Sequence, residues 1–242
     1  MIAATGQSGD PALNKVPAIL YPSPMALTLD GPSLPPASAG KPKQLVVLLH
    51  GYGADGNDLI GLAPHWAPLL SEAEFLSPHA PFPCEMSAFG RQWFGFQGRA
   101  QEQVLEGVRI AAGILDRYLT ELLAERKMDE SALALVGFSQ GAMMSLYVSL
   151  RRAKPVAAVV AYSGRLFVPE MLATELRSRP KMLLVHGDRD EVVPPEALPR
   201  AYEALKAANV PVEQMLRPGL GHGIDGEGLA RGGEFLRAAF AG

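Results

Sequence analysis

Short runs of apolar residues, with no polar residue at alternate positions, recur along the chain. Such runs are typical of strands that are buried on both faces of a sheet. They predict buried strands at 45–49, 132–136, 156–160 and 181–186, with two further strands at 74–77 and 212–216. Residues 18–29 are a candidate edge strand, although Pro22 and Pro24 disfavour one there.

Segments with apolar residues three and four positions apart lie between these strands and predict helices. The longest is predicted at 104–127, and others at 142–150, 195–209 and 229–240. Alternating strands and helices indicate an α/β fold, with a mostly parallel central sheet and helices on both faces. We expect one domain over residues 16–242, preceded by a flexible tail at 1–15.

Composition narrows the class of protein. The 242 residues are 48% hydrophobic and 19% charged, which is typical of a globular chain, and the net charge of −3 gives no reason to expect nucleic acid as a partner. No apolar run is long enough to cross a membrane, and the first residues lack the pattern of a signal peptide, so we expect a cytoplasmic protein. Cys84 is the single cysteine, which excludes an internal disulfide and a multi-cysteine metal cluster.

The sequence Gly-Phe-Ser-Gln-Gly at 137–141 connects a predicted buried strand to a predicted helix. In this context a Gly-x-Ser-x-Gly motif places its serine on a sharp, strained turn that exposes the hydroxyl oxygen. Gly137 and Gly141 remove the Cβ atoms that would collide where strand and helix pass close together. Ser139 is therefore the candidate nucleophile; the alternative is a tight turn that carries a serine by chance.

A serine nucleophile needs a base, and the base needs a group that orients it. His222 lies in a glycine-rich loop between the last strand and the last helix, and it is the candidate base. Asp190 follows the strand at 181–186 and is the candidate orienting acid. His50 and His186 each end an apolar strand, and we interpret them as structural.

The negative oxygen that develops during acyl transfer needs two backbone N–H donors. The N–H of Gln140, directly after the nucleophile, and that of Tyr52, after the first buried strand, are the candidates. A competing pattern occurs at 51–56, where Gly-Tyr-Gly-Ala-Asp-Gly matches a dinucleotide-binding fingerprint. That fingerprint requires a helix starting inside the glycine run, whereas Gly61 and Pro64 allow only a short one.

Several motifs together resemble the phospholipase/carboxylesterase family of α/β-hydrolases, which includes the acyl-protein thioesterases. The resemblance extends from residue 43 to the C-terminus, and it rests on the motifs at 48–58, 137–142, 186–190 with 193–194, and 221–222. It implies Ser139 as nucleophile, Asp190 as orienting acid and His222 as base. Dienelactone hydrolases are similar but carry cysteine at the position of the nucleophile.

The resemblance also implies how substrate is held. The segment Gln-Trp-Phe at 92–94 is similar to an aromatic segment beside the acyl pocket of relatives, so Trp93 and Phe94 are candidate substrate-binding residues, together with Phe138 of the serine motif. The irregular segment 75–96 is the candidate wall of that pocket. The family works without a cofactor or metal, and its members are often monomers or homodimers.

We therefore expect a serine carboxylesterase that acts on short- to medium-chain esters through an acyl-enzyme on Ser139. Its substrate would be a small-molecule ester or acyl thioester. Acyl-protein thioesterase or lysophospholipase activity on the same fold is the first alternative. The second alternative, from another class, is a hydrolase-fold protein that binds ligands without turning them over.

Overall fold

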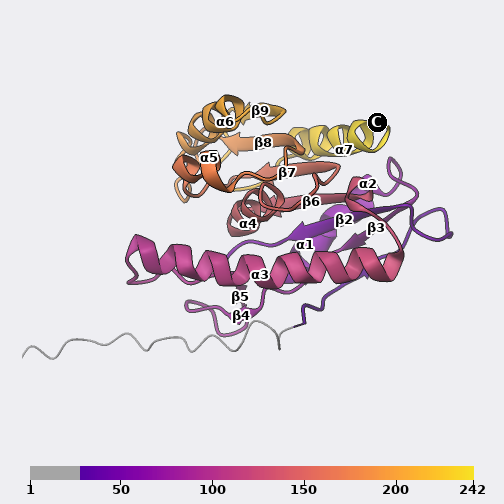
Figure 1. Ribbon diagram of the computed structural model, residues 1–242, viewed down its shortest axis with the longest axis horizontal. Coiled ribbons are helices and arrows are strands. Elements are labelled where there is room, and N and C mark those ends of the chain that lie inside the picture. Colours follow the sequence, from indigo (N-terminus) through magenta and orange to yellow (C-terminus); the bar gives the residue numbers. More distant parts are fainter. Residues whose placement is uncertain (1–27) are drawn as a thin grey trace, which may run out of the picture.

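A seven-stranded sheet forms the centre of the computed structural model, which describes residues 28–242 (Figure 1). Its strand order is β1-β3-β2-β6-β7-β8-β9, and every neighbouring pair is parallel except β1 and β3. The strands are β1 (Ser33–Leu34), β2 (Gln44–Leu49), β3 (Ala73–Leu76), β6 (Leu133–Phe138), β7 (Ala158–Tyr162), β8 (Lys181–Gly187) and β9 (Val212–Arg217). Two further short strands, β4 (Phe82–Pro83) and β5 (Arg91–Gln92), pair with each other outside this sheet.

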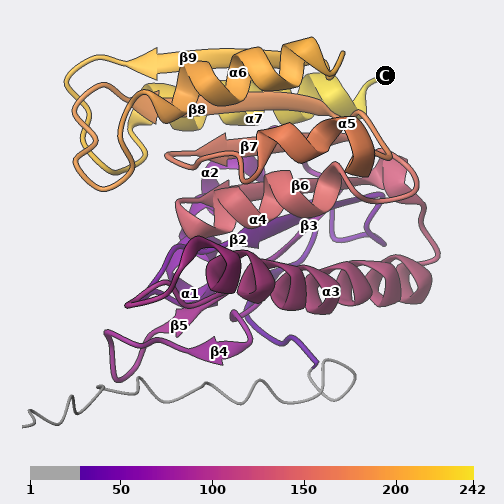
Figure 2. The same cartoon turned by 60° about the vertical axis from the view of Figure 1, so that its left-hand side comes forward.

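Helices cover both faces of the sheet (Figures 1 and 2). One face carries α3 (Gln101–Arg126), α4 (Gln140–Ser149), α5 (Leu172–Glu175) and α6 (Ala197–Ala207). The other face carries α1 (Gly56–Leu59), α2 (Ala63–Trp66) and α7 (Gly226–Phe240). Within residues 28–242 there are also three short 3-10 helices: η2 (Ile60–Leu62), η3 (Glu130–Ala132) and η4 (Pro169–Met171). This is the α/β-hydrolase architecture, in one domain.

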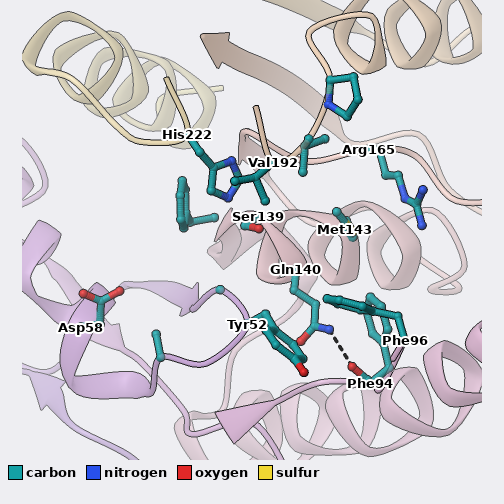
Figure 3. Close-up of a pocket in the computed structure, with 15 residues that line it drawn as sticks. Tyr52, Asp58, Phe94, Phe96, Ser139, Gln140, Met143, Arg165, Val192 and His222 are labelled. Carbon is teal, nitrogen blue, oxygen red and sulfur yellow. Dashed lines mark hydrogen bonds between the residues drawn. The ribbon is translucent and has the colours of Figure 1, made fainter. Parts of the chain in front are cut away.

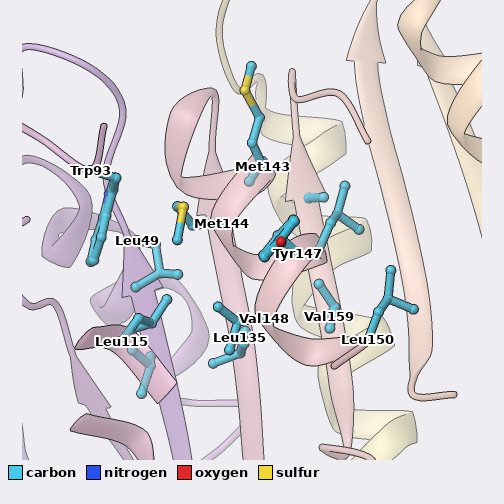
Figure 4. Close-up of a cluster of buried hydrophobic side chains, with 14 of the residues drawn as sticks. Leu49, Trp93, Leu115, Leu135, Met143, Met144, Tyr147, Val148, Leu150 and Val159 are labelled. Atoms are coloured by element: carbon cyan, nitrogen blue, oxygen red, sulfur yellow. The ribbon is translucent and has the colours of Figure 1, made fainter. Parts of the chain in front are cut away.

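Side chains of the central strands alternate between two separate apolar cores. In β2, Leu45, Val47 and Leu49 pack on the face that carries α3 and α4, whereas Val46 and Leu48 pack on the opposite face. Figure 4 shows the first of these cores, in which side chains of α3 and α4 meet those of the strands. Both faces of these strands are buried, which explains why their sequences are continuous apolar runs.

The predicted elements are confirmed with small shifts at their ends. The predicted strand at 156–160 begins instead at Ala158, and the predicted helix at 195–209 begins at Ala197, after a turn in which the Ala197 N–H donates to Pro194. The last helix begins at Gly226, three residues before its predicted start. Its first turn is capped by Asp225, whose carboxylate accepts the N–H of Gly228 at 2.8 Å.

Two predictions for the N-terminal region fall largely outside the described residues. These are the flexible tail at 1–15 and most of the edge strand at 18–29. The strand that edges the sheet in the described part is β1, where Ser33 pairs with Leu76 and Leu34 with Phe75. Within residues 28–242, no helix combines the length and the apolar character needed to cross a membrane.

Helix α4 passes unusually close to the strands beneath it. A Cβ atom on Gly141 would lie 1.8 Å from the carbonyl oxygen of Leu49, and one on Gly137 would lie 2.3 Å from that of Gly141. These neighbours are backbone atoms of buried elements, so they cannot move aside as a flexible side chain would. Only glycine at both positions allows the helix to start directly above the strand ends.

We predict that Gly141→Ala lowers the free energy of unfolding by at least about 3 kcal/mol, because the new methyl group overpacks a rigid backbone contact. Gly113→Ala is the matched control, since Gly113 is an exposed position inside α3 with no atom within 4 Å of the added Cβ. That control should gain roughly 0.5–1 kcal/mol from helix propensity. Urea unfolding followed by circular dichroism measures both, and equal stability of the two variants would contradict the argument.

Candidate active site

A cavity of about 460 Å³ opens where the loops after β2, β6, β7, β8 and β9 meet (Figure 3). Ligands of open parallel sheets bind at this edge, beyond the carboxyl ends of the strands. Most of the residues singled out from the sequence line the cavity: Tyr52, Phe94, Phe138, Ser139, Gln140 and His222. Asp190 lies directly behind His222, and Trp93 lies behind the cavity wall.

Ser139 adopts a strained backbone conformation between β6 and α4. Its φ of 53° and ψ of −116° are rare for a residue with a side chain, and strain of this kind costs roughly 1–3 kcal/mol. The conformation is held from both sides, because the N–H of Ser139 donates to Tyr162 at 2.9 Å and its carbonyl accepts the N–H of Met143 at 3.1 Å. The sharp turn predicted from the glycine motif is therefore present.

His222 is oriented by two neighbours. Its Nδ1 lies 2.8 Å from Oδ2 of Asp190, and its ring packs against the ring of Phe138 with centroids 4.8 Å apart. A carboxylate can only accept a hydrogen bond, so Nδ1 carries the proton and Nε2 is left with a free lone pair. Figure 3 shows His222 beside Ser139 at the cavity wall.

Asp190 is fully buried but remains ionised, because its oxygens are supplied with donors. Burial alone would raise its pKa, but the hydrogen bonds from His222 and from the N–H groups of Val193 and Val192 outweigh that effect, and the net pKa is lowered. The two backbone donors reach Oδ1 at 2.8 and 2.9 Å, which leaves Oδ2 for the imidazole. A charged carboxylate is what a triad needs behind its histidine.

The two histidines interpreted as structural are both buried and hydrogen-bonded. The Nε2 atom of His50 accepts the N–H of Ala80 at 2.9 Å. The Nε2 atom of His186 lies 2.9 Å from the carbonyl oxygen of Val193, so it carries a proton and donates to that oxygen, and it also lies 3.2 Å from Oδ2 of Asp190. His186 thus braces the carboxylate, a contribution that its position at a strand end did not reveal.

The two candidate oxyanion donors flank Ser139. The N–H of Gln140 belongs to the first residue of α4, where it has no intrahelical acceptor. Tyr52 lies in the loop after β2, and in the part of the chain described here neither N–H donates to another protein group. Free donors at a helix N-terminus favour negative charge beside the serine oxygen.

The side chain of Gln140 ties the aromatic segment to the nucleophile turn. Its Oε1 accepts the N–H of Trp93 at 2.7 Å. Its Nε2 donates to the carbonyl oxygen of Phe94, also at 2.7 Å (Figure 3). Phe94 faces the cavity, but Trp93 is fully buried and its indole N–H donates to His50 at 3.0 Å. The structure therefore gives Trp93 a scaffolding position rather than the substrate contact expected from the sequence.

The glycine-rich segment at 51–56 does not form a dinucleotide site. The helix that follows it, α1, spans four residues, and its first turn is capped by Asp55, which accepts the N–H of Asn57 at 2.8 Å. The N–H of Gly56, which would face a phosphate, instead donates to Nδ1 of His79 at 3.1 Å. Residues 28–242 also contain no group of three or more His, Cys, Asp or Glu side chains that could hold a metal ion.

Comparisons with known proteins identify the family of the chain. The model of the phospholipase/carboxylesterase family matches residues 36–240. Esterase YpfH of Escherichia coli is 32% identical over 206 residues, covering 83% of this chain and 85% of that protein. Acyl-protein thioesterase 1 of Gibberella zeae is 25% identical over 209 residues, covering 79% and 88%.

A solved esterase structure has the same fold as this chain. The crystal structure of esterase PE8 superposes with a TM-score of 0.84 at 40% identity, covering 88% of this chain and all of that one. The family match spans nearly the whole described domain and includes every residue that lines the cavity. The chain therefore belongs to the phospholipase/carboxylesterase family and is a serine ester hydrolase of the α/β-hydrolase fold.

Proposed function

We propose that the protein hydrolyses short- to medium-chain carboxylic esters through an acyl-enzyme on Ser139. The observation that carries this proposal is the meeting of two features in one cavity. A serine in a strained turn and a histidine paired with a buried carboxylate both line the same pocket, whose wall is largely apolar. Each feature alone has structural explanations, but together they supply a nucleophile and an oriented base.

In the proposed mechanism, Oγ of Ser139 attacks the ester carbonyl while Nε2 of His222 takes its proton. The N–H groups of Tyr52 and Gln140 stabilise the negative oxygen of the tetrahedral intermediate. His222 then gives the proton to the leaving alcohol, and the acyl group remains on the serine. Water attacks this acyl-enzyme with the same base assisting, which releases the acid and restores Ser139. Asp190 keeps the imidazole in the required tautomer throughout.

An oxygen ester is the favoured substrate, and an acyl thioester is the second candidate. The relatives named esterase are 40% and 32% identical, whereas relatives named acyl-protein thioesterase are 23–28% identical. The apolar side chains Phe94, Phe96 and Met143 form a wall suited to an acyl chain. A non-catalytic binding protein would have no need for a carboxylate held ionised behind His222.

We further propose a reducing compartment, the cytoplasm, as the location of the protein. The chain contains one cysteine, so an oxidising environment would give it no internal disulfide. Its folded domain is held together by two large apolar cores instead.

Replacement of the nucleophile tests the mechanism. Ser139→Ala should lower kcat for p-nitrophenyl butyrate by roughly 10⁴-fold or more, because a triad member is lost. Ser38→Ala is the matched control, since Ser38 is exposed in a turn far along the chain from the cavity residues. An active Ser139→Ala variant would assign the nucleophile elsewhere, and an inactive wild-type protein would favour the binding-protein alternative.

A second prediction concerns the orienting acid. Asp190→Asn should keep the fold but lower kcat by about 10⁴-fold, because the amide favours the wrong imidazole tautomer. Kinetics with p-nitrophenyl butyrate and a thermal melt measure the two effects separately. Asp188→Asn is the control: Asp188 lies in the same turn, but its carboxylate accepts the N–H of Gly219 and does not touch His222. Similar losses of kcat in the two variants would contradict the assignment of Asp190.

A third prediction separates the backbone and side-chain contributions of Gln140. Gln140→Ala keeps the backbone N–H, but it removes both hydrogen bonds to the 93–94 segment, each with a net value of about 1 kcal/mol. KM for p-nitrophenyl octanoate should rise by about tenfold, with kcat changed much less. Gln214→Ala, an exposed change on β9, is the control. A fall in kcat with KM unchanged would show that the side chain supports the chemical step instead.

A further inference from the structure

Arg165 lies at the cavity and has no carboxylate partner among residues 28–242. It lies in the loop after β7, is exposed to solvent and lines the same cavity as Ser139. Several other arginines of the described domain are paired with acids, among them Arg99 with Glu85, Arg126 with Glu74 and Arg217 with Asp225, whereas Arg200 and others also lack such a pair. What distinguishes Arg165 is its place at the cavity that holds Ser139. Within residues 28–242, Arg165 makes no ion pair or hydrogen bond, and its guanidinium carbon lies 4.7 Å from the ring centroid of Phe167.

The loop that carries Arg165 is fixed in an unusual conformation. Ser163 and Val168 both have positive φ angles, 49° and 43°, and a β-branched residue is a rare occupant of this region. Ser163 is anchored because its N–H donates to Val185 at 2.8 Å. Gly164 packs so tightly on α4 that an added Cβ would lie 2.6 Å from Cβ of Ala142. Strained segments persist where the surroundings hold them, and they concentrate at functional sites.

Arg165 lies on the side of Ser139 where the acyl chain of a substrate would extend. Figure 3 shows Met143 between Ser139 and Arg165, and His222 on the other side of Ser139. In the proposed mechanism His222 protonates the leaving group, so the leaving group lies on the His222 side. The acyl chain then extends past Met143 toward Arg165.

The two ends of the cavity also differ in charge. Asp58 lines the cavity at the end opposite Arg165, and in the described part of the chain its carboxylate is in no ion pair (Figure 3). A negative group on the leaving-group side would be repelled by Asp58, whereas one on the acyl side would be attracted by Arg165. A guanidinium also matches the planar geometry of a carboxylate, which it binds through two parallel N–H groups.

We propose that Arg165 binds an anionic group at the far end of the acyl chain, so that the substrates of this enzyme include half-esters of dicarboxylic acids. The inference rests on the proposed function, since it assigns the acyl side from the roles of Ser139 and His222. Partial desolvation lowers the pKa of Arg165, but a guanidinium remains charged near neutral pH. An apolar wall with one cation at its end selects chains that are apolar along their length and negative at their tip.

Matched ester pairs test the inference. The p-nitrophenyl monoesters of adipic and suberic acid are compared with p-nitrophenyl hexanoate and octanoate, which have the same chain lengths and no terminal charge. The measured quantity is the ratio of kcat/KM for the charged ester to that for the neutral one. Arg165→Met should lower this ratio by about tenfold in at least one pair, the value expected when a charged hydrogen bond is lost. Arg165→Lys should retain part of the ratio, because it keeps the charge but not the two-pronged geometry.

Arg200→Met is the control, because Arg200 is an exposed residue of α6 that does not line the cavity. Its ratios should equal those of the wild type. A third pair, 4-acetoxybenzoate and 4-acetoxybenzamide, places the charge on the leaving group. If only this pair responds to Arg165→Met, the anion binds on the leaving-group side and the acyl assignment is wrong.

The remaining outcomes separate this inference from the proposed function. If the wild type hydrolyses the neutral esters and Arg165→Met changes every charged-to-neutral ratio by less than twofold, the inference fails and the esterase function stands. If the wild type hydrolyses none of the esters, the proposed function fails and the inference fails with it. Thermal melts of all variants establish that each is folded before the ratios are compared.

Discussion

The close approach of helix α4 to the ends of β2 and β6 is the constraint on which the site depends. Two glycines permit it, because a Cβ atom at either position would collide with a backbone carbonyl. The short crossing forces Ser139 into its positive φ, and the helix begins at the next residue, Gln140, whose N–H is a candidate oxyanion donor. Packing of the two apolar cores supplies the free energy that holds this strained turn. The reactive geometry is thus a consequence of helix–sheet packing rather than of the loop alone.

The charge of Asp190 is the second feature on which the site depends. A buried carboxylate is costly unless it is surrounded by donors, and Asp190 has two backbone N–H groups, one histidine behind it and one in front. Its charge is therefore retained in a water-poor position, where it acts strongly on the imidazole of His222. Because Oδ1 is fully engaged by the backbone, Oδ2 is fixed in direction. The turn after β8 therefore determines the orientation of His222, because it holds the carboxylate to which His222 is bonded.

Much of this arrangement could be predicted from the sequence, because it follows from topology. Apolar runs identify the parallel strands, and residues that follow such strands must meet at one edge of the sheet, which brings Ser139, Asp190 and His222 together. Contacts that depend on loop paths could not be predicted. The ties from Gln140 to the 93–94 segment join residues 46 and 47 positions apart, and no local pattern signals them. Burial of Trp93 has the same origin, since an aromatic residue in an irregular segment can either pack inside the fold or face a ligand.

The central claim is that Ser139 is the single activated nucleophile of this cavity. Reaction with a fluorophosphonate, followed by peptide mass spectrometry, tests it directly, because the reagent forms a phosphonyl ester only on an activated serine and releases fluoride. The account predicts one phosphonyl group per chain, on the peptide that contains Ser139. It also predicts that His222→Ala slows the labelling strongly, because the base is lost. Labelling of another residue, or no labelling of a protein that hydrolyses esters, would contradict it.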